Sequence, residues 1–330
     1  MVACGQAWNQ SPKPSPKTLT YRLGTSCYKG FFIPSNYVSL FASIERNTVM
    51  RNTDKSLRRR QLLGKGLVLA AGGMLPPLSF AQSRHVERVG LQLYTLRNEM
   101  SQDFEGTLAK VADLGYREME FAGYFNRSAR EVRQVLDDNG MISPAAHIQL
   151  AAIRADLQKE IDFAAELGQQ FIVVPIVANN ERSLDDFKHH AETLNRAGEA
   201  CRAAGLKMGY HNHSFEFHRT GNQVHYDVLL NETEPELVDF ELDLFWITNA
   251  EVDPFSYFSN HPGRFSMLHV KDMDNLGRMA PVGNGTINFA EIFAQVETAG
   301  FKHYFVEHDN PGNGIASIAS SIYTVRNLRF

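Results

Sequence analysis

Eight short apolar runs that alternate with amphipathic stretches constrain the fold of this chain more than any other feature. The expected strands are Val89–Leu96, Glu118–Ala122, Ser143–Ile148, Phe171–Ile176, Lys207–His213, Leu237–Leu244, Ser266–Val270 and Tyr304–Glu307. Between them, helical spacing of apolar residues extends over Phe104–Leu114, Ser128–Asp138, Ala155–Leu167, Leu184–Ala204 and Phe289–Ala299. Strands that alternate with helices in this way predict a parallel sheet covered by helices.

The number and spacing of these elements predict a closed barrel. Eight strands with intervening helices within residues 82–330 match the count and size of a (β/α)8 TIM barrel, which we expect as the single domain of this part of the chain. A doubly wound open sheet is the alternative. It is disfavoured because Gln92-Leu93-Tyr94-Thr95 follows the first strand, where such sheets carry a GxGxxG sequence.

The first 81 residues differ in charge from the rest of the chain. They hold 11 of the 33 basic residues but only two of the 37 acidic residues, Glu45 and Asp54. Residues 82–330 therefore have a formal charge of −13, and they contain all 12 histidines. Nucleic-acid binding relies on a basic surface, so we expect no nucleic-acid partner for this acidic segment.

Residues 50–81 have the pattern of an export signal. Arg58-Arg59-Arg60 leads into an apolar stretch that ends in Ser79-Phe80-Ala81, a small-x-small cleavage site. The paired arginines followed by Gln-Leu-Leu resemble a twin-arginine signal, so we expect the Tat export machinery as a partner and a periplasmic or secreted protein. The stretch is interrupted by Lys65 and by glycines, so we expect no stable membrane anchor, although an anchor or a buried helix is the alternative interpretation.

The segment before this signal has no clear pattern. Signal peptides begin close to their basic region, yet 57 residues precede Arg58, whereas Met50 would open an ordinary basic start. We expect translation to begin at Met50, with residues 1–49 an over-extended reading frame. A genuine disordered leader is the alternative, and peptides from residues 1–49 found by mass spectrometry in the native host would establish it.

Polar side chains collect where the expected strands end, which is the end of a TIM barrel that carries the active site. Four of them fall at this end of successive strands: His211, Asp243, His269 and Glu307. Imidazole and carboxylate groups that converge in this way suit a divalent cation such as Mn²⁺, Co²⁺ or Zn²⁺. We therefore expect these four residues to bind one metal ion.

Other polar residues have simpler expected roles. Asp239 and Glu241 share a strand face with Asp243 but sit deeper, so we expect them to be structural. Cys201 lies in an expected helix and is expected to pack there. Surface or hydrogen-bonded positions are expected for His189, His190, His218 and His225.

Several motifs occur in a fixed order along the chain: Gln92–Arg97, Tyr210–His213, Asp243 with Trp246, His269–Asp272 and Gly283–Phe289. This ordered set resembles the xylose isomerase-like TIM-barrel superfamily, often called sugar phosphate isomerases/epimerases, over essentially all of residues 89–330. The twin-arginine start resembles the exported members. The resemblance implies one divalent metal held by a Glu-Asp-His-Glu set, whose last three members fall on Asp243, His269 and Glu307.

The first member of that set departs from the family. His211 stands where a glutamate is usual, and the epimerases use two glutamates to exchange protons on opposite faces of an enediolate. Glu307 is thus the implied base, and the resemblance leaves His213 or Glu216 for the second proton. Lys271 is expected to steady the developing oxyanion. The implied substrate-binding residues are His147, Glu120 and Trp246.

The expected function is a divalent-metal-dependent isomerase or epimerase of a sugar or keto-sugar, which abstracts a proton next to a metal-bound carbonyl. A 3-keto-glycoside lyase or hydrolase is the alternative. An AP endonuclease is disfavoured by the acidic charge, and a non-catalytic sugar-binding protein would need no metal. Export argues against a phosphorylated substrate, so the expected partner is a small carbohydrate; the sequence leaves open whether the chain is an oligomer.

Overall fold

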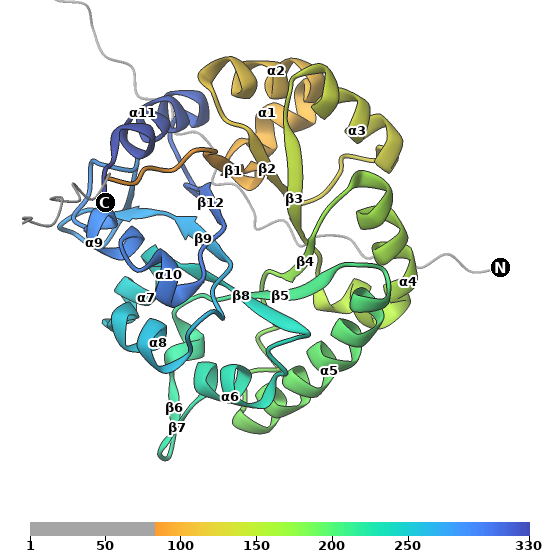
Figure 1. Ribbon diagram of the computed structural model, residues 1–330, viewed down its shortest axis with the longest axis vertical. Coiled ribbons are helices and arrows are strands. Elements are labelled where there is room, and N and C mark those ends of the chain that lie inside the picture. The colour runs from red at the N-terminus through yellow and green to blue at the C-terminus, as the bar shows by residue number, and fades with distance from the viewer. Residues whose placement is uncertain (1–82) are drawn as a thin grey trace, which may run out of the picture. The chain divides into compact units, whose positions relative to one another are not determined.

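The computed structural model describes residues 83–330, so the expected leader (1–49) and signal (50–81) lie outside the described residues. Eight parallel strands form a closed barrel, and the last strand pairs with the first (Figure 1). In barrel order they are β1 (Gly90–Gln92), β2 (Glu118–Phe121), β3 (Ile142–His147), β4 (Phe171–Val174), β5 (Lys207–His211), β8 (Val238–Asp243), β9 (Met267–Val270) and β12 (His303–Val306). The predicted (β/α)8 barrel is confirmed.

Helices form the outer ring of the barrel (Figure 1). The predicted helices are present as α2 (Phe104–Leu114), α3 (Ala129–Asp138), α4 (Leu150–Leu167), α5 (Leu184–Ala203) and the pair α9 (Phe289–Phe293) and α10 (Val296–Ala299). Capping boxes start two of them: Ser128 with Glu131 begins α3, and Ser183 with Asp186 begins α5. The periodicity did not reveal α1 (Arg97–Gln102), α6 (His225–Glu232), α7 (Leu244–Asn249), α8 (Pro254–Asn260) and α11 (Gly314–Asn327).

Short elements decorate the loops. The hairpin of β6 (Arg219–Thr220) and β7 (Gln223–Val224) projects from the ring (Figure 1). A second hairpin joins β10 (Asp272–Met273) to β11 (Met279–Ala280), and two 3₁₀ turns are η1 (Leu93–Leu96) and η2 (Phe215–Phe217). Within residues 83–330, no helix is both long enough and apolar enough to cross a membrane.

Several strands end earlier than the sequence predicts. The first expected strand covered residues 89–96, but β1 ends at Gln92, whose side chain accepts a hydrogen bond from the Tyr94 backbone N–H and starts η1. Leu93 and Leu96 made this run look like a continuous strand because both are buried, yet they are buried in a helical turn. Because β1 ends early, the residues that follow it form the 3₁₀ turn η1 at the carboxyl end of the barrel and do not extend the strand.

Inside the barrel, a small apolar layer lies beside charged pairs at the amino end, and carboxylates and imidazoles collect toward the carboxyl end. A small layer near the amino end is separate from the large core between barrel and helices, and it consists of Ala145, Phe171, Val173, Met267 and Phe305. Glycine is required beside it, because a Cβ on Gly90 would lie 2.5 Å from the Phe305 ring and one on Gly209 would lie 2.9 Å from Val173. Toward the carboxyl end the inward side chains are carboxylates and imidazoles.

Candidate metal centre and active site

A cavity of about 300 Å³ opens at the carboxyl end of the barrel, where TIM-barrel active sites lie. Its walls come from the ends of β3, β5 and β12 and from the loops that follow the strands. The lining residues are Tyr94, Ala122, His147, Gln149, Pro175, Ile176, His211, His213, Lys271, Glu307 and Asp309. Five predicted site residues therefore face one cavity: His147, His211, His213, Lys271 and Glu307.

The four predicted metal ligands are brought together beside this cavity. The ligand atoms of His211, Asp243, His269 and Glu307, which we call the outer cluster, all lie within 4.8 Å of one another, and all four residues are buried. His269 Nδ1 lies 2.8 Å from Glu307 Oε2 and 3.5 Å from Asp243 Oδ2. His211 Nε2 lies 3.1 Å from the same Asp243 oxygen. Two imidazole nitrogens and two carboxylates thus converge on one point.

The hydrogen bonds of His211 show that this donor set suits a cation. His211 Nδ1 lies 2.9 Å from the carbonyl oxygen of Pro175, which can only accept, so the ring proton is on Nδ1. Burial and the nearby charge of His269 lower the pKa of His211, which favours the neutral ring. Its Nε2 then directs a lone pair at the Asp243 carboxylate, and a cation bound by both groups would relieve the repulsion between these two acceptors.

Lys271 balances part of the negative charge. Its Nζ lies 3.0 Å from Asp243 Oδ2, 2.8 Å from Glu307 Oε2 and 2.8 Å from Asp309 Oδ1. Burial alone would lower the pKa of Lys271, but these carboxylates outweigh it and hold the pKa well above its usual value. Burial likewise acts to raise the pKa of Glu307, but Lys271 and His269 hold it far below its usual range, so the Glu307 carboxylate is ionised.

A second set of side chains lies beneath the outer cluster and shares His269 with it. The ligand atoms of Glu120, His147, Glu241 and His269, which we call the inner cluster, also lie within 4.8 Å of one another. His269 Nε2 is 2.7 Å from Glu120 Oε2, and His147 Nε2 is 2.8 Å from Glu241 Oε2. Glu120 and Glu241 are fully buried, and one oxygen of each lacks a hydrogen-bond partner among the described residues. Neither glutamate lines the cavity, and both lie beneath it.

Besides Asp243, His269 and Glu120, two further predicted site residues, Glu216 and Trp246, do not line the cavity. Glu216 accepts hydrogen bonds from the Tyr210 hydroxyl at 3.0 Å and from the His213 backbone N–H at 2.8 Å, and burial raises its pKa to about 8. Trp246 packs behind the wall, with its ring centroid 5.2 Å from that of His213 and 5.9 Å from Lys271 Nζ. Burial, the main cause, and the nearby His211 ring lower the pKa of His213 to about 2, so the His213 ring is neutral.

Sequence reasoning missed Asp309 and Tyr94. Asp309 lies two residues beyond Glu307, so strand-like alternation would have placed it on the same side, and burial followed by the Glu307 charge raises its pKa to about 6. Tyr94 lies in η1 at the cavity rim, where Arg97 stacks 4.1 Å from its ring centroid. Its turn was hidden inside an apparent strand. Asp239 pairs with Lys207 at 3.2 Å, away from the cavity lining.

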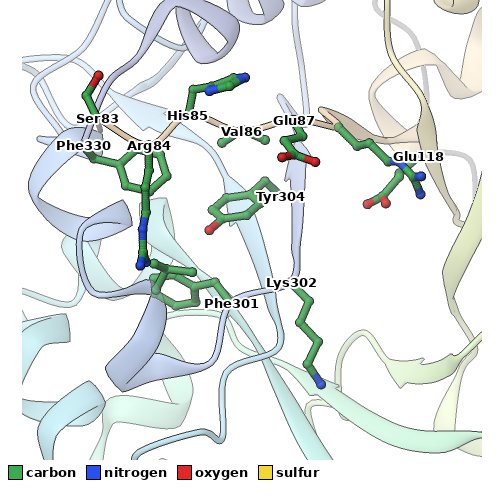
Figure 2. Close-up of a pocket in the computed structure, with 12 residues that line it drawn as sticks. Ser83, Arg84, His85, Val86, Glu87, Glu118, Phe301, Lys302, Tyr304 and Phe330 are labelled. Atoms are coloured by element: carbon green, nitrogen blue, oxygen red, sulfur yellow. The ribbon is translucent and has the colours of Figure 1, made fainter. Parts of the chain in front are cut away.

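Figure 2 shows another cavity, of about 780 Å³, at the amino end of the barrel. It lies among the segment that precedes β1, the start of β2 and the residues around the start of β12. Two of its charged residues are paired, since Arg84 contacts Glu297 at 2.7 Å and Glu118 contacts His303 at 2.8 Å. Among the described residues, the groups of side chains that could hold a metal ion lie at the carboxyl end and not around this larger cavity.

Comparison with known proteins agrees with the geometry. The inosose dehydratase of Lacticaseibacillus casei is 21% identical over 249 residues, which cover 62% of this chain and 80% of that protein. A crystal structure of a sugar phosphate isomerase/epimerase from Parabacteroides distasonis is 28% identical, with a TM-score of 0.62, over 76% of this chain and 97% of the other. The IolI protein, solved with a bound zinc atom, is 14% identical with a TM-score of 0.57, over 72% of this chain and 96% of that one.

The family itself is recognised over most of the barrel. Residues 108–323 match the family described as xylose isomerase-like TIM barrel, which is about two thirds of the chain and extends from α2 into α11. Fold, site position and sequence thus agree. The chain belongs to the xylose isomerase-like TIM-barrel family.

Proposed function

We propose that this chain is a divalent-metal-dependent enzyme that removes a proton from the carbon next to the carbonyl of a keto-sugar. The observation that carries the proposal is the outer cluster, whose four metal-type donors include the Glu307 carboxylate and lie beside the Lys271 ammonium. His211, Glu307 and Lys271 line one cavity. The names of two similar proteins, a sugar phosphate isomerase/epimerase and an inosose dehydratase, support a polyhydroxy ketone as the substrate.

Each residue has a definite role in this proposal. His211, Asp243, His269 and Glu307 would hold the cation, which when bound polarises a carbonyl and makes the neighbouring C–H bond more acidic. Glu307 contacts Lys271 and His269 through Oε2, which leaves Oε1 to accept the proton as the C–H bond breaks. The Lys271 ammonium stabilises the negative charge that develops on the carbonyl oxygen.

The arrangement favours elimination over two-base epimerisation. Epimerisation needs a second acid across the substrate from Glu307, but His211 occupies the usual glutamate position with its Nδ1 bonded to the Pro175 carbonyl. Asp309 lines the cavity beside Glu307 with a pKa of about 6, so it is suited to protonate a departing oxygen. In this β-elimination Glu307 takes the proton, the C–H electron pair forms the C=C bond, and the C–O bond at the next carbon breaks. The departing hydroxide or alkoxide receives a proton from Asp309 and leaves as water or alcohol.

Isomerisation or epimerisation, the expectation from the sequence, is the second candidate. One base is enough to move a proton between neighbouring carbons on one face, and the Parabacteroides distasonis structure carries an isomerase/epimerase name. Both candidates begin with the same proton abstraction.

An NMR screen in D₂O separates the two. The purified protein, loaded with Mn²⁺, Co²⁺ or Zn²⁺ and then freed of excess paramagnetic ion, is incubated with keto-sugars and 3-keto-glycosides. Loss of water or of an aglycone supports elimination, whereas a deuterated isomer supports isomerisation. The absence of both deuterium exchange and product with every metal and substrate would contradict the proposed proton abstraction.

We also propose export through the twin-arginine pathway, on the basis of the Arg58-Arg59-Arg60 signal. Export would favour a carbohydrate without phosphate. Fractionation of cells that express the full chain tests this proposal: the wild-type protein is expected outside the cytoplasm, and the Arg58→Lys/Arg59→Lys/Arg60→Lys variant inside it. Cytoplasmic wild-type protein would overturn the proposal.

A further inference from the structure

The two carboxylates of the inner cluster contact His269 at Nε2, the ring nitrogen that faces away from the other ligands of the outer cluster. Glu120 Oε2 lies 2.7 Å from His269 Nε2, and Glu241 Oε2 lies 3.2 Å from the same nitrogen. The other nitrogen, Nδ1, lies 2.8 Å from Glu307 Oε2. The imidazole of His269 therefore has one edge toward each cluster, and His269 and both inner carboxylates are fully buried.

We infer that Glu120 is a positioning residue for the metal centre: it accepts the hydrogen bond of His269 Nε2–H and so leaves the Nδ1 lone pair directed at the cation. This inference rests on the metal site proposed above. A cation that binds Nδ1 displaces any proton on that nitrogen, and the acceptor beside Nε2 keeps the remaining ring proton there. Such outer partners also fix the ring orientation, and losing one typically weakens metal binding about tenfold to a hundredfold.

Glu120 is itself held in place by a directed chain of hydrogen bonds. The Tyr94 backbone N–H donates to Gln92 Oε1 at 3.0 Å, which fixes the orientation of the Gln92 amide. The Gln92 Nε2 group therefore faces Glu120 and donates to its Oε2 at 2.8 Å. Since a backbone group starts this chain, the position of the Glu120 oxygen is set by β1 and η1. The acceptor at His269 Nε2 is thus built into the fold.

The inner cluster has the composition of a second cation site, but its contacts favour the positioning role. Its closest contacts, Glu120 to His269 and Glu241 to His147, have the lengths of imidazole–carboxylate hydrogen bonds. A cation here would have to bind His269 Nε2 while the outer cation binds Nδ1, and that requires a ring with no proton. A hydrogen bond needs no such ring.

Metal titrations of full-chain variants test the inference. Wild-type, Glu120→Ala, Glu120→Gln and Glu118→Ala proteins are stripped of metal and titrated with Zn²⁺ against a chelator, and their Co²⁺ complexes are compared by visible absorption. Glu120→Ala is expected to weaken Zn²⁺ binding about tenfold to a hundredfold and to change the Co²⁺ spectrum. Glu120→Gln keeps an acceptor oxygen, so its Zn²⁺ affinity should lie between those of wild type and Glu120→Ala. Its Co²⁺ spectrum should stay close to that of wild type.

Glu118 is the matched control, because it is a buried carboxylate on the same strand with its own histidine partner, His303. Glu118→Ala should leave affinity and spectrum unchanged even if it lowers stability. Equal affinities in wild type and both Glu120 variants would overturn the inference, as would an equal loss in Glu118→Ala. If Glu120→Ala does not fold, Glu120→Gln and Glu118→Gln are compared instead, with a severalfold loss expected only in the former and equal affinities counting against the inference.

Two further results separate this inference from the proposed function. Two bound equivalents in wild type, one of them lost in Glu120→Ala, would replace the positioning role with a second cation site. No metal binding in wild type would refute the metal site itself, and the inference with it. A single equivalent in wild type that Glu120→Ala binds unchanged would refute only the role of Glu120.

Discussion

Two buried Glu–His pairs have their glutamates on the same strand, β2, but lie in different surroundings. Glu118, at the amino end of β2, lies 2.8 Å from His303, and Glu120, two residues further on, lies 2.7 Å from His269. Both pairs are buried. The ring of His303 lies between the aromatic rings of Phe171 and Phe305, at centroid distances of 5.9 and 6.0 Å.

The difference lies in what the second imidazole nitrogen faces. His269 has Asp243 and Glu307 beside its second nitrogen, whereas the surroundings of His303 are apolar rings. The same residue pair therefore supports the barrel at one end and the proposed metal centre at the other. The neighbours decide the role, rather than the strength of the hydrogen bond.

The buried charged groups also differ between the amino and carboxyl ends of the barrel. At the amino end Asp239 is matched by Lys207 and the Ser266 hydroxyl. At the carboxyl end one buried lysine, Lys271, and two imidazoles, those of His147 and His269, face five carboxylates, those of Glu120, Glu241, Asp243, Glu307 and Asp309. Burial acts to lower the pKa values of both imidazoles, but the carboxylates outweigh it and raise them. Buried negative charge in excess is costly unless cations compensate it, so the carboxyl end is organised to receive positive charge.

Replacing the base should produce the largest effect. Glu307→Gln is expected to lower turnover by about 100- to 10,000-fold, because the amide cannot accept the substrate proton. The rate of substrate deuterium exchange measures this. Glu118→Gln, at the opposite end, should keep its rate, and a Glu307→Gln enzyme with full activity would remove Glu307 from the role of base.

Removing an imidazole should distinguish the two ends by metal content. His269→Ala is expected to weaken Zn²⁺ binding by more than about a hundredfold, beyond the usual loss for an outer partner, because a direct ligand is lost. Elemental analysis after dialysis gives the retained metal. His303→Ala should retain as much metal as wild type, and similar metal content in both variants would contradict the assignment of His269 as a ligand.

Neutralising the buried lysine should affect stability. Lys271→Met is expected to lower the free energy of unfolding by about 3–5 kcal/mol, since three carboxylates lose their shared ammonium. Lys207→Met at the amino end removes a partly exposed ion pair and should cost about 1 kcal/mol or less. Urea unfolding with a chelator present measures both. Equal losses would mean that charge balance does not distinguish the ends.

The pH dependence of stability tests a carboxyl-end residue that faces away from the cavity. The folded-state pKa of Glu216, about 8, exceeds its ordinary value of 4.5, so its contribution to stability is full below 4.5 and disappears as the pH rises through 8. Between pH 5 and 8 this group should lower the free energy of unfolding by about 1.4 kcal/mol per pH unit.

Glu216→Gln should flatten that slope and preserve turnover, because the uncharged amide resembles the protonated acid and the side chain does not line the cavity. Urea unfolding at several pH values gives the slope. Loss of turnover in a folded Glu216→Gln protein would return Glu216 to the list of proton-transfer residues.

Much of the fold could be predicted from the sequence, because strands and helix ends are marked by patterns of neighbouring residues. Short apolar runs marked all eight barrel strands, and glycines such as Gly115 and Gly168, which cap α2 and α4 in the left-handed conformation, marked helix ends. The prediction was wrong at a turn, where residues 93–96 form η1 and not the end of a strand. Leu93 and Leu96 are buried for reasons of packing around η1, and a list of apolar positions does not distinguish that burial from burial in a strand.

By itself the sequence determined the barrel, the end of the barrel at which the polar side chains collect, and the set His211, Asp243, His269 and Glu307. These follow from periods of two and 3.6 residues and from one rule about strand ends. Tertiary structure alone decided that Glu120 and Glu241 share His269 with the outer cluster, that Asp309 reaches Lys271, and that Glu216 faces away. The physical reason is that register and twist in a closed barrel set distances between strands, and those distances are not encoded in the spacing along any one strand.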